Sequence, residues 1–211
     1  MQTLAETEVP PLVVQTRPVF NMDDEQFFEF CQINSDLQIE RNAQGEIIIM
    51  APGGGSTGSG ETTLIQIFAN WSEKDGIGEI FGSSGGFILP NGATRSPDIS
   101  WVRGERLDAL TDEEWVRFLP LCPDFVLELR SPSDSLNRLK KKMEEYRDNG
   151  AQLGWLLDPK THCIFIYRPG EEVEMRENPE SLSGEPLLKG FTLDVPAVWR
   201  AIERKRRRKA D

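Results

Sequence analysis

Three short apolar runs, and the amphipathic segment between the first two, constrain the fold of this chain more than any other feature. The runs are Asp124–Leu129, Leu153–Leu157 and Cys163–Tyr167, and each is rich in residues that form buried strands. The segment Ser131–Tyr146 opens with the helix-starting cluster Ser-Pro-Ser-Asp, and its apolar residues recur at helical spacing. This arrangement of strands and a helix predicts one α/β domain with a mixed sheet.

The rest of the chain predicts further elements of the same domain. We expect an extended arm over residues 1–19, the domain over residues 20–203 and a basic tail over residues 204–211. The apolar periodicity predicts helices at Asn21–Asn34, Glu61–Glu73, Glu105–Phe118 and Val195–Arg204, and strands at Leu37–Glu40, Glu46–Met50, Ile77–Phe81, Gly86–Leu89, Ser96–Val102 and Glu172–Arg176.

Charge is distributed unevenly along the chain. The formal net charge of −11 argues against a large nonspecific nucleic-acid surface. The segment Arg200–Asp211 holds seven basic and two acidic residues, so it carries +5 and the remainder of the chain carries −16. The basic run could contact phosphates, or it could be a solvated tail.

The cysteines and the N-terminus point to a reducing compartment. Cys31, Cys122 and Cys163 lie far apart and form no Cys-x-x-Cys pair, which argues against a zinc cage and a disulfide framework. The first residues lack the basic start and apolar core of a signal peptide, and no stretch approaches the length of a membrane span. We therefore expect a cytoplasmic protein.

A glycine- and serine-rich stretch, Gly53–Gly60, precedes the expected helix at Glu61–Glu73. Backbone N–H groups before a helix bind anions, so a phosphate-binding loop must be considered. The nucleotide-binding version ends in Gly-Lys-Ser/Thr, whereas here Gly60 is followed by Glu61. The composition instead favours a flexible loop over a cleft.

Two acids stand at positions where a strand would favour other residues. Glu128 interrupts the apolar run near its end, where a carboxylate is costly unless a cation, a donor or a metal compensates it. Asp98 begins another expected strand, directly after Pro97. Taken singly, Asp98 could brace a turn, and Glu128 could be a buried acid paired with Arg130 or Lys142. Together they could hold one or two Mg²⁺ ions at one end of a sheet.

Helical geometry selects the lysine that could join these acids. At about 100° per residue, Lys142 lies at the edge of the apolar stripe beside Tyr146, whereas Lys141 points to solvent. Lys142 can therefore reach back over the sheet toward Glu128. Arg130 shares the strand face of Glu128 and is a second candidate for the cationic catalytic role, although arginine cannot act as a general base.

These motifs resemble the PD-(D/E)XK nuclease superfamily and, more closely, the Uma-type restriction endonuclease family. The matching segments are ERNAQGEIIIM from Glu40, RSPDISWV, PDFVLELRSPSD, KMEEYRDNG and GWLLDP, and they span most of residues 20–170. The resemblance implies a restriction endonuclease-like core, a central mixed sheet flanked by helices, and cleavage of DNA with Mg²⁺ or Mn²⁺. It implies that Asp98 and Glu128 are the metal ligands and that Lys142 is the lysine, displaced onto the helix. The superfamily places its lysine two residues after the acid, where this chain has Arg130.

Other functions and features remain to be weighed beside the nuclease. A member with little catalytic power could bind nucleic acid or a protein partner through the same cleft. A Ser-His-Asp hydrolase would depend on His162, the only histidine, and no Gly-x-Ser-x-Gly elbow supports it. Glu40, at the end of the expected strand Leu37–Glu40, could be an extra acid near the site, but a surface acid is the favoured interpretation. A homodimer would place two sites on a duplex, but the sequence shows no dimer surface.

A basic rim could offset the acidic body of the protein where DNA would bind. Its members would be Arg95, Arg103, Arg130, Arg138, Lys140, Lys141 and Lys142.

Overall fold

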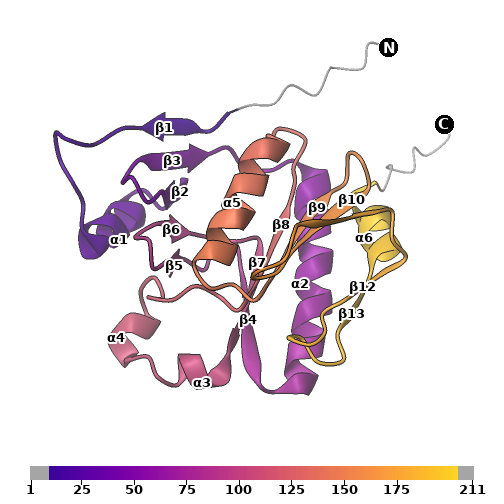
Figure 1. Ribbon diagram of the computed structural model, residues 1–211. Coiled ribbons are helices and arrows are strands. Elements are labelled where there is room, and N and C mark those ends of the chain that lie inside the picture. The colour runs from indigo at the N-terminus through magenta and orange to yellow at the C-terminus, as the bar shows by residue number, and fades with distance from the viewer. Residues whose placement is uncertain (1–9, 204–211) are drawn as a thin grey trace, which may run out of the picture.

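A six-stranded mixed sheet forms the centre of the protein, which a computed structural model describes over residues 10–203 (Figure 1). Its strand order is β11-β10-β9-β8-β7-β4; β8 and β9 pair in parallel and the other neighbours are antiparallel. The strands are β4 (Gly78–Gly82), β7 (Ile99–Arg103), β8 (Phe125–Leu129), β9 (Leu153–Asp158), β10 (Cys163–Tyr167) and β11 (Glu174–Glu177). The predicted α/β class with a central mixed sheet is confirmed.

Helices cover both faces of this sheet (Figure 1). Helix α5 (Leu136–Asp148) connects the parallel strands β8 and β9 and lies on one face, while α2 (Gly55–Asp75) and α6 (Val195–Ile202) pack together on the other. Successive side chains of β8 point to opposite faces, so Val126 joins the core under α5 and Leu127 joins the core under α2. A strand buried on both faces needs the near-continuous apolar sequence that identified it.

A smaller five-stranded sheet lies beside the central one in Figure 1, in the order β1-β3-β2-β6-β5. Part of the expected arm forms its edge strand, β1. The remaining elements comprise helix α1, two short helices and a hairpin of β12 and β13. Their bounds are β1 (Leu12–Val14), α1 (Asp24–Ile33), β2 (Gln38–Arg41), β3 (Ile47–Met50), β5 (Phe87–Ile88), β6 (Thr94–Arg95), α3 (Gly104–Leu107), α4 (Asp112–Trp115), β12 (Ser181–Ser183) and β13 (Thr192–Asp194).

The glycine-rich stretch is helical, so the prediction of a flexible loop was wrong. Helix α2 begins at Gly55 and runs through the serines and glycines. A Cβ at Gly60 would lie 2.6 Å from the side chain of Ile202 and 3.0 Å from that of Leu129. Gly60 thus lets α2 approach α6 and the end of β8 closely, a requirement that the local sequence could not reveal.

The single helix expected at Glu105–Phe118 is also wrong, because the structure has two short helices there. Thr111 caps the second helix, α4, and forms a reciprocal capping box with Glu114. An N-cap residue has an extended backbone, which interrupts any helix running through it. Trp115, at the end of α4, is 46% exposed, so this helix does not anchor the core through its tryptophan.

Some expectations concern residues outside the part of the chain that the structure describes. The basic tail at residues 204–211 and the first nine residues of the arm are among them. Within residues 10–203, no helix combines the length and apolar character needed to cross a membrane.

Candidate active site

The pairing of β7 with β8 brings Asp98 beside Glu128. Ile99 pairs with Leu127 in antiparallel register, and the same register carried one residue further sets Asp98 opposite Glu128. The Asp98 carboxylate accepts a hydrogen bond of 2.7 Å from the backbone N–H of Leu129. Residues opposite one another share a sheet face, so both carboxylates lie on the α5 side. The convergence anticipated from two strand-borne acids is present in the structure.

Helix α5 places two polar side chains against Glu128. The Glu128 side chain is buried, and its Oε1 accepts a hydrogen bond of 3.1 Å from the Tyr146 hydroxyl. Lys142 Nζ lies 2.8 Å from the same oxygen. Lys142 and Tyr146 are four residues apart and therefore lie on the same face of the helix. The sequence had predicted this neighbourhood, because helical geometry places Lys142 beside Tyr146 at the edge of the apolar stripe.

Glu40 joins the site from β2, so the expectation of a surface acid was wrong. It is 2% exposed, and its Oε1 lies 2.8 Å from Lys142 Nζ and 3.0 Å from the backbone N–H of Ser96. Its Oε2 lies 2.9 Å from the guanidinium of Arg95. Arg95 in turn binds Glu145 at 2.6 Å, one helical turn beyond Lys142. The small sheet thus contributes a buried carboxylate that sequence analysis assigned to the surface.

The charges of these groups perturb one another strongly. Burial would raise the pKa of Glu40, but Lys142 and Arg95 outweigh it and hold this pKa at about 2. Burial would lower the pKa of Lys142, but Glu128 and Glu40 raise it above the usual range, so the ammonium stays protonated. By contrast, burial first and Glu128 second raise the pKa of Asp98 well above its usual value, and burial also raises that of Glu128. The positive charge near Asp98 and Glu128 is therefore too small to offset the cost of burying their carboxylates.

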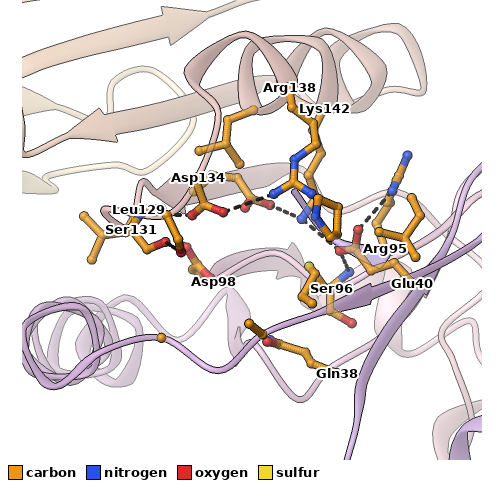
Figure 2. A pocket seen from close by; sticks show the side chains of 18 of the residues that line it. Gln38, Glu40, Arg95, Ser96, Asp98, Leu129, Ser131, Asp134, Arg138 and Lys142 are labelled. Atoms are coloured by element: carbon orange, nitrogen blue, oxygen red, sulfur yellow. Dashed lines mark hydrogen bonds and ion pairs between the residues drawn. The ribbon is translucent and has the colours of Figure 1, made fainter. Parts of the chain in front are cut away.

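These side chains line a pocket of about 380 Å³ (Figure 2). In that view Lys142 extends from its helix toward Glu40 and Arg95, and Asp98 lies on the other side with Ser131. The lining contains six carboxylates, Glu40, Glu61, Asp98, Glu128, Asp134 and Glu145, and four cations, Arg95, Arg138, Lys141 and Lys142. Six negative and four positive charges leave a formal charge of −2, which one divalent cation would neutralise.

The donor set fits a hard cation with water and phosphate as further ligands. Among residues 10–203 no three His, Cys, Asp or Glu side chains form a preassembled metal site. Mg²⁺ is commonly held by one or two carboxylates and completes its shell with waters and substrate phosphates. Asp98 and Glu128 supply that number of carboxylates, and their raised pKa values show the electrostatic cost that a cation would relieve.

Arg130, the second candidate for the cationic role, faces away from this pocket. Its guanidinium lies 3.1 Å from the buried carboxylate of Asp158 and donates to the backbone carbonyl of Asp134. The register of the parallel strands β8 and β9 explains this contact. Leu129 pairs with Leu157, so the residues that follow them, Arg130 and Asp158, also lie side by side. Of the seven residues proposed for a basic rim, Arg103, Arg130 and Lys140 do not line the pocket; the other four do.

Four of the six lining acids, Glu40, Glu61, Asp134 and Glu145, were not chosen from the sequence as site residues. Glu40 occupies a four-residue strand, and its cationic partners lie far along the chain, so only the Glu40-containing motif of the family resemblance marked it. Glu61 lies on α2, lines the pocket, and has a pKa raised by burial. Its helix was predicted to start there, but nothing local indicated which way it faces.

Comparisons with known proteins agree with this architecture. The family model described as "Uma2: Putative restriction endonuclease" matches residues 24–196. No curated protein matches the chain. A solved structure described as a "putative nuclease belonging to DUF820", from Anabaena variabilis, is similar with a TM-score of 0.67 and 21% sequence identity, covering 78% of this chain and 90% of that one. At this identity the similarity establishes the fold alone.

Proposed function

Because the chain belongs to the Uma2 family, we propose that it is a Mg²⁺-dependent endonuclease that hydrolyses phosphodiester bonds of DNA in the pocket described above. The observation that carries the proposal is the convergence of Asp98 and Glu128 with the Lys142 ammonium, 2.8 Å from Glu128. Asp98 and Glu128 would hold Mg²⁺, or Mn²⁺ in its place. Bound there, the ion would supply a Lewis acid that activates water and offsets charge on the phosphate.

Lys142 fits the role of a charge stabiliser. A general base must be unprotonated at the working pH so that it can accept a proton. The two carboxylates beside Lys142 instead keep its ammonium group protonated. A fixed ammonium near the carboxylates can instead stabilise the negative charge that develops on the phosphate oxygens. The ion pair with Asp158 gives Arg130 a structural role, which is to tie the end of β8 to the end of β9.

The acidic body limits how DNA can bind. Affinity for a duplex grows with the number of phosphates that Lys and Arg neutralise. Three of the four cations lining the pocket are paired with carboxylates, namely Arg95, Arg138 and Lys142. Binding would then rest on few phosphate contacts plus the cation, so we propose modest affinity and a DNA interaction that depends on divalent metal.

Nicking of supercoiled plasmid tests the proposal. Wild-type protein should nick plasmid in Mg²⁺ or Mn²⁺ and lose this activity in EDTA. Asp98→Asn and Glu128→Gln should each lower the rate by about 100-fold or more, because an amide binds Mg²⁺ weakly. Asn can keep the hydrogen bond from Leu129, and Gln can keep those from Tyr146 and Lys142, so only charge is removed.

Asp148→Asn provides the matched control. This exposed acid ends α5 and pairs only with Arg147 among the described contacts, so its removal should leave nicking unchanged. Full activity in Asp98→Asn and Glu128→Gln would refute the proposed site. A wild type that binds DNA in Mg²⁺ and Mn²⁺ without cleaving it would refute the enzyme and favour the binding module.

A further inference from the structure

The lysine of this pocket lies on a helix, which raises the question of what fixes its position. A lysine placed two residues after the acid would be held by the same strand as that acid. Lys142 instead projects from α5 on a flexible four-carbon stem, and ordering such a side chain costs rotamer entropy. Contacts made by the ammonium must therefore supply the fixed position.

Glu40 makes such a contact and is itself firmly held. Its Oε1 lies 2.8 Å from Lys142 Nζ, opposite the 2.8 Å contact that Lys142 makes with Glu128. The Ser96 N–H donates to that oxygen, and the Arg95 guanidinium binds the other one. A carboxylate with both oxygens engaged and 2% exposure has little freedom to move.

The ion pairs then return to the helix that carries the lysine. They run from Lys142 to Glu40 and on to Arg95 (Figure 2). Arg95 then binds Glu145 of α5. Residues 142 and 145 lie on neighbouring turns of one helical face. The small sheet therefore contacts α5 at two points, through Glu40 and through Arg95. This arrangement resists both a swing of the Lys142 stem and a shift of the helix.

We propose that Glu40 is a positioning residue that holds the Lys142 ammonium against Glu128, doing for a helix-borne lysine what the strand backbone does for a lysine two residues after the acid. The catalytic consequence of this proposal rests on the nuclease function proposed above. Glu40 is not a metal ligand in this scheme, because Lys142, Ser96 and Arg95 already occupy both of its oxygens.

Glu40→Gln tests the proposal, with Glu46→Gln as the matched control. Glu46 follows the turn of the same hairpin, accepts a hydrogen bond from Asn42 and does not itself line the pocket, so its substitution should change no readout. Glu40→Gln should lower kcat by about tenfold to a hundredfold, the effect expected of a misplaced catalytic group, with KM within about twofold of wild type. The Kd for Mn²⁺, measured by electron paramagnetic resonance, should also stay within about twofold.

Lysine acetylation followed by peptide mass spectrometry gives a readout that needs no nuclease activity. The rate at Lys142 is divided by the rate at exposed Lys141, which serves as an internal reference. Releasing one of its two carboxylate contacts should raise the relative rate at Lys142 by about fivefold or more. Should the wild type prove inactive on DNA, this measurement still decides whether Glu40 holds Lys142.

An unchanged kcat or an unchanged acetylation ratio in Glu40→Gln would overturn the proposal. A tenfold loss of Mn²⁺ affinity would overturn it too, since Glu40 would then be a ligand. Glu40→Asp covers the case in which the Gln variant does not fold. It keeps the charge that buried Arg95 requires but withdraws the carboxylate by one methylene, so it should show the same lowered kcat and raised acetylation.

Discussion

Asp98→Asn should stabilise the metal-free protein while removing its response to Mg²⁺. Burial and the nearby charge of Glu128 raise the pKa of Asp98 well above its usual value, and the Leu129 hydrogen bond lowers this pKa by less. The folded state thus carries an electrostatic cost at Asp98 near neutral pH. An isosteric amide removes that cost and keeps the hydrogen bond.

The size of the effect follows from general magnitudes. Relieving a strained site of this kind adds about 0.5–2 kcal/mol to the free energy of unfolding. For a chain of 150–250 residues, 1 kcal/mol shifts Tm by about 2–4 °C, so metal-free Asp98→Asn should melt about 1–8 °C above wild type. Mg²⁺ at 100 times its Kd should stabilise the wild type by about 2.7 kcal/mol, or about 5–11 °C, which exceeds the gain of about 0.5–2 kcal/mol from the substitution, and should leave the variant unchanged. The order of the two melting temperatures therefore reverses when Mg²⁺ is added.

The pH dependence of stability has a definite sign. Between the unfolded pKa of an aspartic acid, about 4, and its raised folded value, the folded state binds more protons than the unfolded state. The Asp98 contribution to wild-type stability is therefore greatest at low pH and is lost as pH rises through this window. The amount by which the Tm of Asp98→Asn exceeds that of the wild type should therefore grow as the pH rises through this window.

Differential scanning calorimetry in EDTA and in Mg²⁺ measures both effects. A lower Tm for Asp98→Asn in EDTA would mean that the carboxylate stabilises the fold and acts as a brace for its turn. An equal Mg²⁺ shift in both proteins would mean that the ion binds elsewhere. Either result would refute the reasoning that assigns a metal to this carboxylate.

Two further predictions concern the supports of the site. Gly60→Ala should lower the free energy of unfolding by about 1–3 kcal/mol, since the new Cβ would lie 2.6 Å from Ile202, whereas Gly58→Ala, with open space around it, should raise this free energy by about 0.5–1 kcal/mol in urea titrations. Arg130→Lys places a lysine two residues after Glu128 but should not raise the nicking rate, because Asp158 binds that position; it should lower stability by about 1–2 kcal/mol, and a faster enzyme would contradict this assignment.

Helix and strand periodicity explains what could be predicted about the site. Glu128 interrupts an apolar run, and the position of Lys142 on its helical stripe directs its stem toward the sheet. Both inferences use side-chain direction within one element, which the local backbone geometry fixes. The pairing of Asp98 with Glu128 required one further assumption, that their strands are neighbours, and the structure has them adjacent.

Two features that depend on partners far along the chain were predicted wrongly. Gly53–Gly60 has loop composition, yet most of it is helical, and its last residue, Gly60, packs against a later helix and the end of β8. Glu40 has the surroundings of a surface acid, yet Arg95 and Lys142 arrive from β6 and α5 and make its burial favourable. In both cases the decisive contact joins segments that the sequence alone does not place together.

The sequence by itself determined the α/β class, the central strands, the lysine helix and the identity of three polar groups in the pocket, because each depends on a local repeat or on a charge within an apolar run. Only the tertiary structure decided which acids are buried, which cations neutralise them and that Arg130 serves Asp158. The physical reason is that desolvation and charge pairing are properties of the assembled neighbourhood. A carboxylate at the same position in the chain is exposed or buried according to which elements pack over it.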